Sequence, residues 1–106
     1  MHTNTSVQIN ARGERPITTL FPLGCTTATP RALALLRAHG TNPAALLDRH
    51  AAGDWGEIAP EDRGLNERAV RDGDRVLSIY HVGTGRVCVI TEADRSATTL
   101  LLPEDY

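Results

Sequence analysis

The last third of the chain decides the fold, and residues 75–102 read RVLSIYHVGTGRVCVITEADRSATTLLL. Three runs rich in β-branched and aliphatic residues are separated by two turn signals, the Gly-Thr-Gly at 83–85 and the polar residues 92–96. Such runs are typical of β-strands, and tight turns between them favour antiparallel neighbours. This stretch predicts a three-stranded antiparallel β-meander.

A three-residue loop at 83–85 and a five-residue turn at 92–96 set the expected register. The expected pairs are Val82–Arg86, His81–Val87, Tyr80–Cys88, Thr91–Ala97, Val89–Thr99 and Val87–Leu101. Both faces of the middle strand are then apolar, as in a strand covered on both sides. Because the helices can cover only one face completely, we expect the second face to be covered by the N-terminal segment, by Trp55 and its neighbours, or by another copy of the chain.

Helix signals precede the meander. Thr29-Pro30 and Asn42-Pro43 each combine an N-capping side chain with proline at the first helical position. Glycines at 40 and 53 should end these two helices, and residues 60–71 predict a third, ragged helix because Gly64 falls inside it.

Residues 17–21 predict an N-terminal strand, since they are β-branched or aromatic and a proline follows them. Residues 1–16 are mostly polar and are predicted to form a flexible arm. The expected architecture is a single α+β domain over 17–106, with an N-terminal strand, two or three short helices and the C-terminal meander.

Composition excludes several chemistries. The 106 residues contain no lysine, which rules out a Schiff base, a Walker-type phosphate loop and a catalytic Ser-Lys pair. A net charge of -2 gives no general attraction to nucleic acid or to an anionic membrane. No apolar run resembles a signal peptide or a membrane span, so we expect a cytoplasmic protein.

Metal and cofactor sites have no sequence signal. Cys25 and Cys88 lack zinc-type spacing, and the redox state of this pair stays open, although a buried reduced thiol is the default for Cys88. The four histidines have no partner at ligand spacing, and His50 is expected to face inward from its helix. We therefore expect neither a metal nor a cofactor.

Two segments are candidate binding sites. The turn at 92–96 brings Glu92, Asp94 and Arg95 to a hairpin tip, where side chains can meet a partner or can bond their own turn. The second candidate is Asp54-Trp55, which is flanked by glycines. Trp55 is interpreted either as an aromatic anchor for a partner or as a plug in the core.

Several short motifs carry a family resemblance. They are LFPLG (20–24), ATP (28–30), AL (34–35), GDWG (53–56), ITEADRS (90–96), TT (98–99), LLPE (101–104) and Tyr106. On these motifs the chain resembles a family of uncharacterised plasmid-related proteins from proteobacterial plasmids and integrated mobile elements, sometimes labelled as restriction-system subunits. The restriction label has no support in the residues, because an Asn-Pro-Pro-Tyr methylation motif and a glycine-rich cofactor loop are both missing.

Two functional hypotheses follow from different classes. The first is a mobile-element accessory protein without enzymatic activity, which acts by binding a protein partner or a second copy of itself through Trp55, Asp54 and the 92–96 turn. The alternative is a metal-independent ribonuclease of the barnase/RelE-like type. Its base, acid and phosphate-binding cation would come from His81, Arg86, Glu92 and Arg95.

Overall fold

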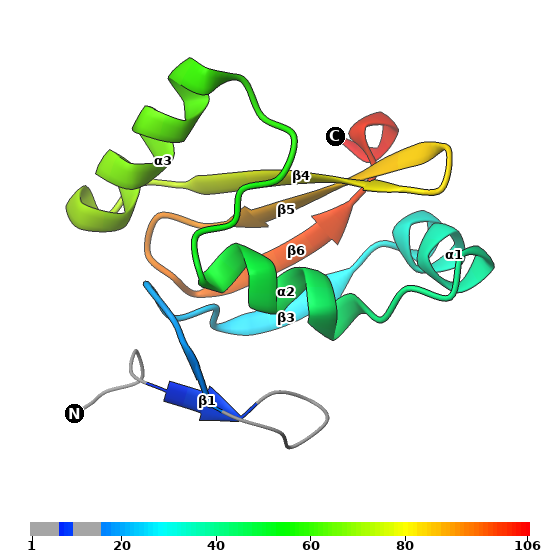
Figure 1. The fold of residues 1–106 in the computed structure, drawn as a ribbon, viewed down its shortest axis with the longest axis horizontal. Helices are drawn as coiled ribbons and strands as arrows, with labels where there is room; N and C mark the ends of the chain where they lie inside the picture. The colour runs from blue at the N-terminus through cyan, green and yellow to red at the C-terminus, as the bar shows by residue number, and fades with distance from the viewer. Residues whose placement is uncertain (1–6, 10–15) are drawn as a thin grey trace.

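A computed structural model describes residues 7–9 and 16–106 of the chain. Its elements are β1 (Val7–Ile9), β2 (Pro16–Thr18), β3 (Cys25–Ala28), α1 (Pro30–Ala38), α2 (Pro43–Ala51), α3 (Pro60–Asp72), β4 (Val76–Val82), β5 (Gly85–Thr91), β6 (Ala97–Leu101) and the 3-10 turn η1 (Pro103–Asp105). Figure 1 shows α1 and α2 against one face of the sheet, with α3 beside β4. The α+β class is confirmed. Most of the predicted flexible arm, residues 1–16, lies outside the described residues, apart from β1 and the first residue of β2.

The main sheet has four strands in the order β3-β6-β5-β4, and β3 runs parallel to β6. The antiparallel strands β4, β5 and β6 form the predicted meander. The expectation of a three-stranded sheet was wrong, because β3 adds a fourth strand. The expected strand at 17–21 was also wrong in its extent, because β2 ends at Thr18. Thr19 and Phe21 are buried in the core, so this segment packs inward instead of pairing as a strand.

The predicted register was wrong by one residue in both hairpins. Val82 pairs with Gly85, because only two residues form the first turn and Gly83 takes a φ of +60° as in a type II′ turn. In the second hairpin the Glu92 N–H donates to the Ala97 carbonyl (3.0 Å). The observed pairs are His81–Arg86, Tyr80–Val87, Cys88–Leu101, Val89–Leu100, Ile90–Thr99 and Thr91–Thr98.

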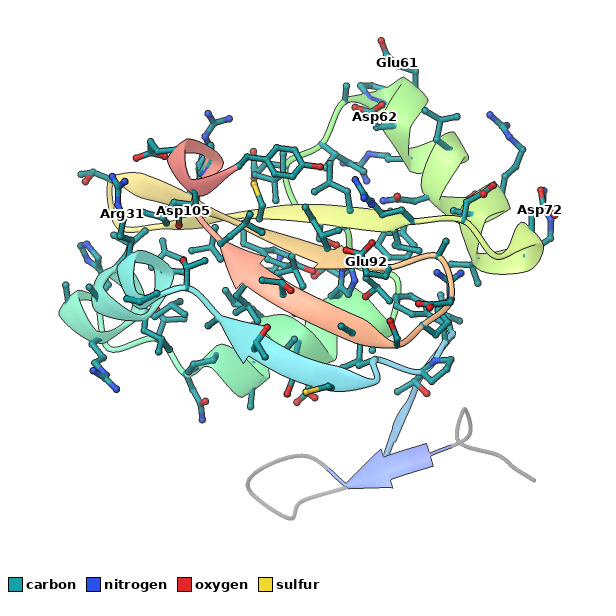
Figure 2. The ribbon with its side chains drawn as sticks, turned by 180° about the vertical axis from the view of Figure 1, so that it is seen from behind. Arg31, Glu61, Asp62, Asp72, Glu92 and Asp105 are labelled. Atoms are coloured by element: carbon teal, nitrogen blue, oxygen red, sulfur yellow. The ribbon has the colours of Figure 1, made fainter. Side chains whose placement is uncertain are left out.

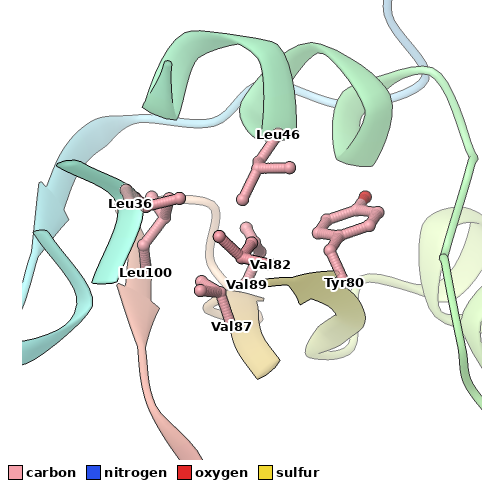
Figure 3. Packing of buried hydrophobic residues seen from close by; sticks show 7 residues of the cluster. All are labelled: Leu36, Leu46, Tyr80, Val82, Val87, Val89 and Leu100. Carbon is pink, nitrogen blue, oxygen red and sulfur yellow. The ribbon is translucent and has the colours of Figure 1, made fainter. Parts of the chain in front are cut away.

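This shift changes which residues share a face, because a slip of one residue moves a strand's side chains to the other side of the sheet. The main core cluster lies between α1, α2 and the face of the sheet beneath them: Leu36, Leu46, Tyr80, Val82, Val87, Val89 and Leu100 (Figure 3). A second cluster lies towards α3 and contains Phe21, Trp55, Ile58, Ala69 and Val76. The helices therefore cover one face of β4, β5 and β6, whereas β3 stays largely exposed.

The opposite face is apolar in its centre, as predicted, and no α-helix lies in front of it (Figure 2). Its central residues Ile90 and Leu101 are nevertheless only 5% and 8% exposed. The C-terminal residues lie against this part of the sheet, where η1 packs beside β5 and Arg75 donates to the Tyr106 hydroxyl (3.1 Å). This C-terminal segment was not among the covers expected from the sequence.

The outer edge of β4 is occupied by other parts of the chain. Ile79 forms a parallel bridge with Gly56, donating to the Trp55 carbonyl and accepting from the Glu57 N–H. Gly56 is required there, because a Cβ at this position would overlap the Ile79 carbonyl. The buried Asn66 side chain then accepts from the Leu77 N–H (3.1 Å) and donates to the Leu77 carbonyl (2.6 Å), as a neighbouring strand would.

Replacing Asn66 by alanine should lower the free energy of unfolding by about 2–3 kcal/mol, because both backbone groups of Leu77 lose their partner in a buried setting. Urea unfolding measures the change. The matched control is Glu67→Ala on the exposed side of the same helix, which should change stability by less than about 0.5 kcal/mol. Equal effects of the two substitutions would contradict this role for Asn66.

Candidate functional site

The turn at 92–96 is bonded mainly to the protein itself. Arg95 has a φ of +62°, and its guanidinium donates to the carbonyls of Asp74 (2.6 Å), Ala69 (2.8 Å) and Glu92 (3.2 Å). It also lies over the Phe21 ring, with 5.3 Å to the centroid. Arg95 therefore fastens the turn to the C-terminal end of α3.

The two carboxylates of this turn have nearby partners. Asp94 accepts from the Ser96 N–H (3.0 Å), and hydrogen bonds to Ser96 lower the pKa of the Asp94 carboxyl. Glu92 pairs with Arg75 at 3.5 Å between exposed side chains. These contacts match the structural interpretation of the turn, in which its polar groups hold the hairpin.

Trp55 lies inside the protein, with 4% of its surface exposed, and therefore offers no exposed aromatic anchor. Its ring stacks on Phe21 and meets His50 edge-on, at centroid distances of 6.3 and 6.0 Å. Asp54 accepts from Arg49 Nε (2.7 Å) and from the Gly56 N–H (3.2 Å). The Arg49 bond is the main reason that the pKa of Asp54 is lowered. Trp55 is thus the core plug that was weighed against the anchor.

The structure divides the four residues of the ribonuclease hypothesis between opposite ends of the sheet. His81 and Arg86 are exposed and paired next to the first turn. Glu92 follows the far end of β5, about 20 Å away at roughly 3.3 Å per residue. With Arg95 engaged by carbonyls, the four do not form one site.

A chain of buried polar groups surrounds His50, which is fully buried on α2. His50 Nδ1 lies 2.6 Å from the Ser78 hydroxyl and Nε2 lies 2.9 Å from the Thr91 hydroxyl. Thr91 contacts the Thr98 hydroxyl (2.7 Å), which donates to the Leu23 carbonyl (2.7 Å). The sequence placed His50 on the inward face but contained no signal for these partners.

The direction of every bond in this chain follows from its last member. Because Thr98 uses its proton on the Leu23 carbonyl, Thr91 must donate to Thr98, and His50 must donate to Thr91 from Nε2. Nδ1 then accepts from Ser78. Burial, with a smaller contribution from the charge of Arg95, lowers the pKa of His50 from 6.5 to about 4. The imidazole is therefore neutral at pH 7, and its role is structural, because it links α2 to β4 and β5 inside the core.

The exposed feature with the clearest binding geometry is the outer edge of β3. The N–H groups of Cys25 and Thr29 bond the carbonyls of Ser96 and Leu100. Because backbone groups alternate along a strand, the N–H and C=O of Thr26 and Ala28 point away from β6. In the described part of the chain β3 pairs with β6 alone.

A cavity of about 210 Å³ opens beside this edge, on the helix-covered side of the sheet. Its lining is uncharged and consists of Thr26, Thr27, Ala28, Leu33, Pro43, Leu47 and Leu100. A second cavity, of about 250 Å³, lies by the first hairpin turn and includes the charged side chains of Arg86 and Glu104. The first cavity adjoins the outward backbone groups of Thr26 and Ala28.

Three further properties of the described residues bear on function. Both cysteines are free, and burial raises the pKa of the Cys88 thiol. Among these residues no cluster of three or more His, Cys, Asp and Glu is placed to hold a metal ion. No helix within 7–9 and 16–106 has the length and apolarity needed to cross a membrane.

Stability should depend on pH through His50. The unfolded chain takes up a proton below pH 6.5, whereas folded His50 stays neutral to about pH 4. The stability that it contributes is complete above pH 6.5 and falls by about 3 kcal/mol as the pH drops to 4. Urea unfolding at pH 7 and pH 4.5 should show this loss, which shrinks in His50→Asn and persists in the control His81→Asn. An equal pH dependence in both variants would contradict it.

Replacing Arg95 by alanine should lower the free energy of unfolding by about 2 kcal/mol, because three carbonyls lose a charged donor. The matched control Arg71→Ala removes an exposed charge from the last turn of α3 and should cost only a few tenths of a kcal/mol. Thermal unfolding of both variants compares the two. A loss for Arg95→Ala no larger than the control's would show that the contacts carry no stability.

Comparison with known proteins adds no relative. No family model matches the sequence, and no curated protein or solved structure matches it significantly. The resemblance to plasmid-related proteins therefore stays a prediction.

Proposed function

We propose that this protein is a non-enzymatic accessory protein that binds an extended segment of a partner protein along the free edge of β3. The observation that carries the proposal is the position of the uncharged cavity directly beside this edge. An added strand gains affinity from main-chain hydrogen bonds and specificity from side-chain pockets. The four residues of β3 offer an unpaired backbone edge and an adjacent side-chain pocket.

The chemistry of the edge defines the segment that fits. The N–H and C=O groups of Thr26 and Ala28 supply two donors and two acceptors for an incoming backbone. Alternate side chains of the added strand face the helix side of the sheet, where Leu33, Leu47 and Leu100 line the cavity. A charged side chain would lose its hydration there without a partner. The segment should therefore carry aliphatic residues at the positions whose side chains face the cavity.

The two edges of the sheet differ, and the difference supports binding at β3. Backbone groups of 55–57 and the side chain of Asn66 occupy the edge of β4. Proteins commonly cover sheet edges in this way to prevent unwanted pairing. The β3 edge has no such cover among the described residues.

The 92–96 turn contributes to this proposal by positioning β3. The Ser96 carbonyl accepts from the Cys25 N–H (3.0 Å), so the turn sets where β3 begins. Arg95 holds the same turn to α3. The most specific stretch of the plasmid-related resemblance thus supports the binding edge, and we extend the proposal to an accessory role on a mobile element.

A panel of ten-residue peptides with alternating aliphatic residues tests the proposal by two-dimensional NMR of the labelled protein. Binding should shift the amide signals of Thr26 and Ala28, because their N–H groups gain a partner. Thr26→Pro, which removes one N–H, should weaken binding by about tenfold, the value of one hydrogen bond.

The control for this experiment is Cys25→Ser, which keeps the backbone of β3 and changes an exposed side chain that does not line the cavity. It should bind the peptides as the wild type does. Peptides that shift signals at the His81–Arg86 end of the sheet instead, or that bind Thr26→Pro at full strength, would refute binding at β3.

A further inference from the structure

We propose that the β3 edge receives strand β1 of a second copy of this chain, which gives a dimer joined by exchanged N-terminal strands. The inference rests on the strand-addition site proposed above and names its occupant. Four observations carry it: the free edge of β1, the matching register, the cavity, and the short connection between β2 and β3.

The free edge of β1 follows from its pairing with β2. The pairs are Val7–Thr18, Gln8–Ile17 and Ile9–Pro16. Since Pro16 has no N–H, Ile9 and Pro16 cannot exchange two hydrogen bonds, so Gln8 and Ile17 are the exchanging pair. The N–H and C=O groups of Val7 and Ile9 therefore point to the side of β1 away from β2.

These groups match the outward groups of β3. In an antiparallel arrangement Val7 lies opposite Ala28 and Ile9 lies opposite Thr26, which forms four backbone hydrogen bonds across the new edge. Because opposite residues share a face, Val7 and Ile9 then stand on the helix side of the sheet, at the uncharged cavity. This edge therefore requires aliphatic residues at the first and third positions of the added strand, which face the cavity.

A symmetric pair of β3 strands centred on Thr26 fits the cavity less well. If two copies of β3 met about Thr26, Gly24 of one copy would lie opposite Ala28 of the other. Glycine has no side chain to enter the cavity, which would then stay empty. Strand β1 places Val7 at that position.

The same chain cannot supply β1 to its own β3 in this register. With β1 between them, β2 and β3 would run parallel, and a parallel crossover takes a dozen or more residues. Residues 19–24 are fewer, and both ends are held: Leu20 N–H donates to the Ala51 carbonyl (2.8 Å) and the Leu23 carbonyl accepts from Thr98. The strand must come from a second copy.

The β1–β2 pair also gains from a third strand. It forms a sheet of its own, with three residues in each strand, and Figure 1 shows β1 apart from the main sheet on the β3 side. Two-stranded pairs are marginally stable in water, whereas three strands or packing against another element are needed for independent stability. Adding β1 to β3 gives this pair a third strand and packs it against the main sheet.

Disulfide trapping tests the register directly. In this arrangement Gln8 lies opposite Thr27 as a non-hydrogen-bonded pair, with a Cα separation suited to a disulfide. Full-length Gln8→Cys and Thr27→Cys chains, each also carrying Cys25→Ser, should form a mixed disulfide under mild oxidation. The control is Gln8→Cys with Thr26→Cys, whose side chains face opposite sides of the sheet and should cross-link at least tenfold less. Equal cross-linking of both mixtures would overturn the register.

Light scattering after size exclusion tests the dimer. The wild type should have the mass of two chains, Val7→Asp/Ile9→Asp and Thr26→Pro should each have the mass of one, and Gln8→Asp should remain dimeric. Because Val7 and Ile9 lie outside the four-stranded sheet, their substitution leaves the main fold intact even if Thr26→Pro does not fold, which circular dichroism checks. A dimer in all variants, or a monomeric wild type at millimolar concentration, would overturn the inference. In the second case peptide binding at Thr26 would still support the proposed function.

Discussion

The buried hydrogen-bond chain from Ser78 through His50, Thr91 and Thr98 to the Leu23 carbonyl is the constraint on which the rest of the structure depends. It joins α2 to three strands and to the segment before β3. Every buried side-chain nitrogen or oxygen among the described residues has a partner, so this network is satisfied rather than strained. Its last bond holds Leu23 two residues before β3, and the position of the β3 edge follows from it.

The network also sets the strand register. His50 needs hydroxyl groups from β4 and β5 on the same face of the sheet, and Ser78 and Thr91 provide them. A slip of one residue would bring aliphatic side chains such as Leu77 or Ile90 to the imidazole and leave it buried without partners. The two-residue turn at Gly83 and the polar network thus favour the same pairing, one from local backbone geometry and the other from the interior.

Sequence reasoning succeeded where the structure is determined locally. Thr29-Pro30 and Asn42-Pro43 start helices through bonds within four residues, so their positions were predictable. The register was not, because it depends on one backbone angle and on partners far apart in the chain. Strand β3 has four residues and pairs with residues about 70 positions later, which leaves no periodic signal.

The same distinction between local and long-range signals applies to the candidate site. The structural alternatives for Trp55 and Arg95 could be weighed from residue type, whereas the free edge of β3 required the topology.

Trp55 has one more consequence. It is the chain's only tryptophan, and its ring packs edge-on against His50 within the core. The indole emission of the unlabelled protein therefore comes from one position, beside the imidazole whose pKa burial lowers to about 4. Trp55 is therefore an internal fluorescent probe of the core that fixes the strand register.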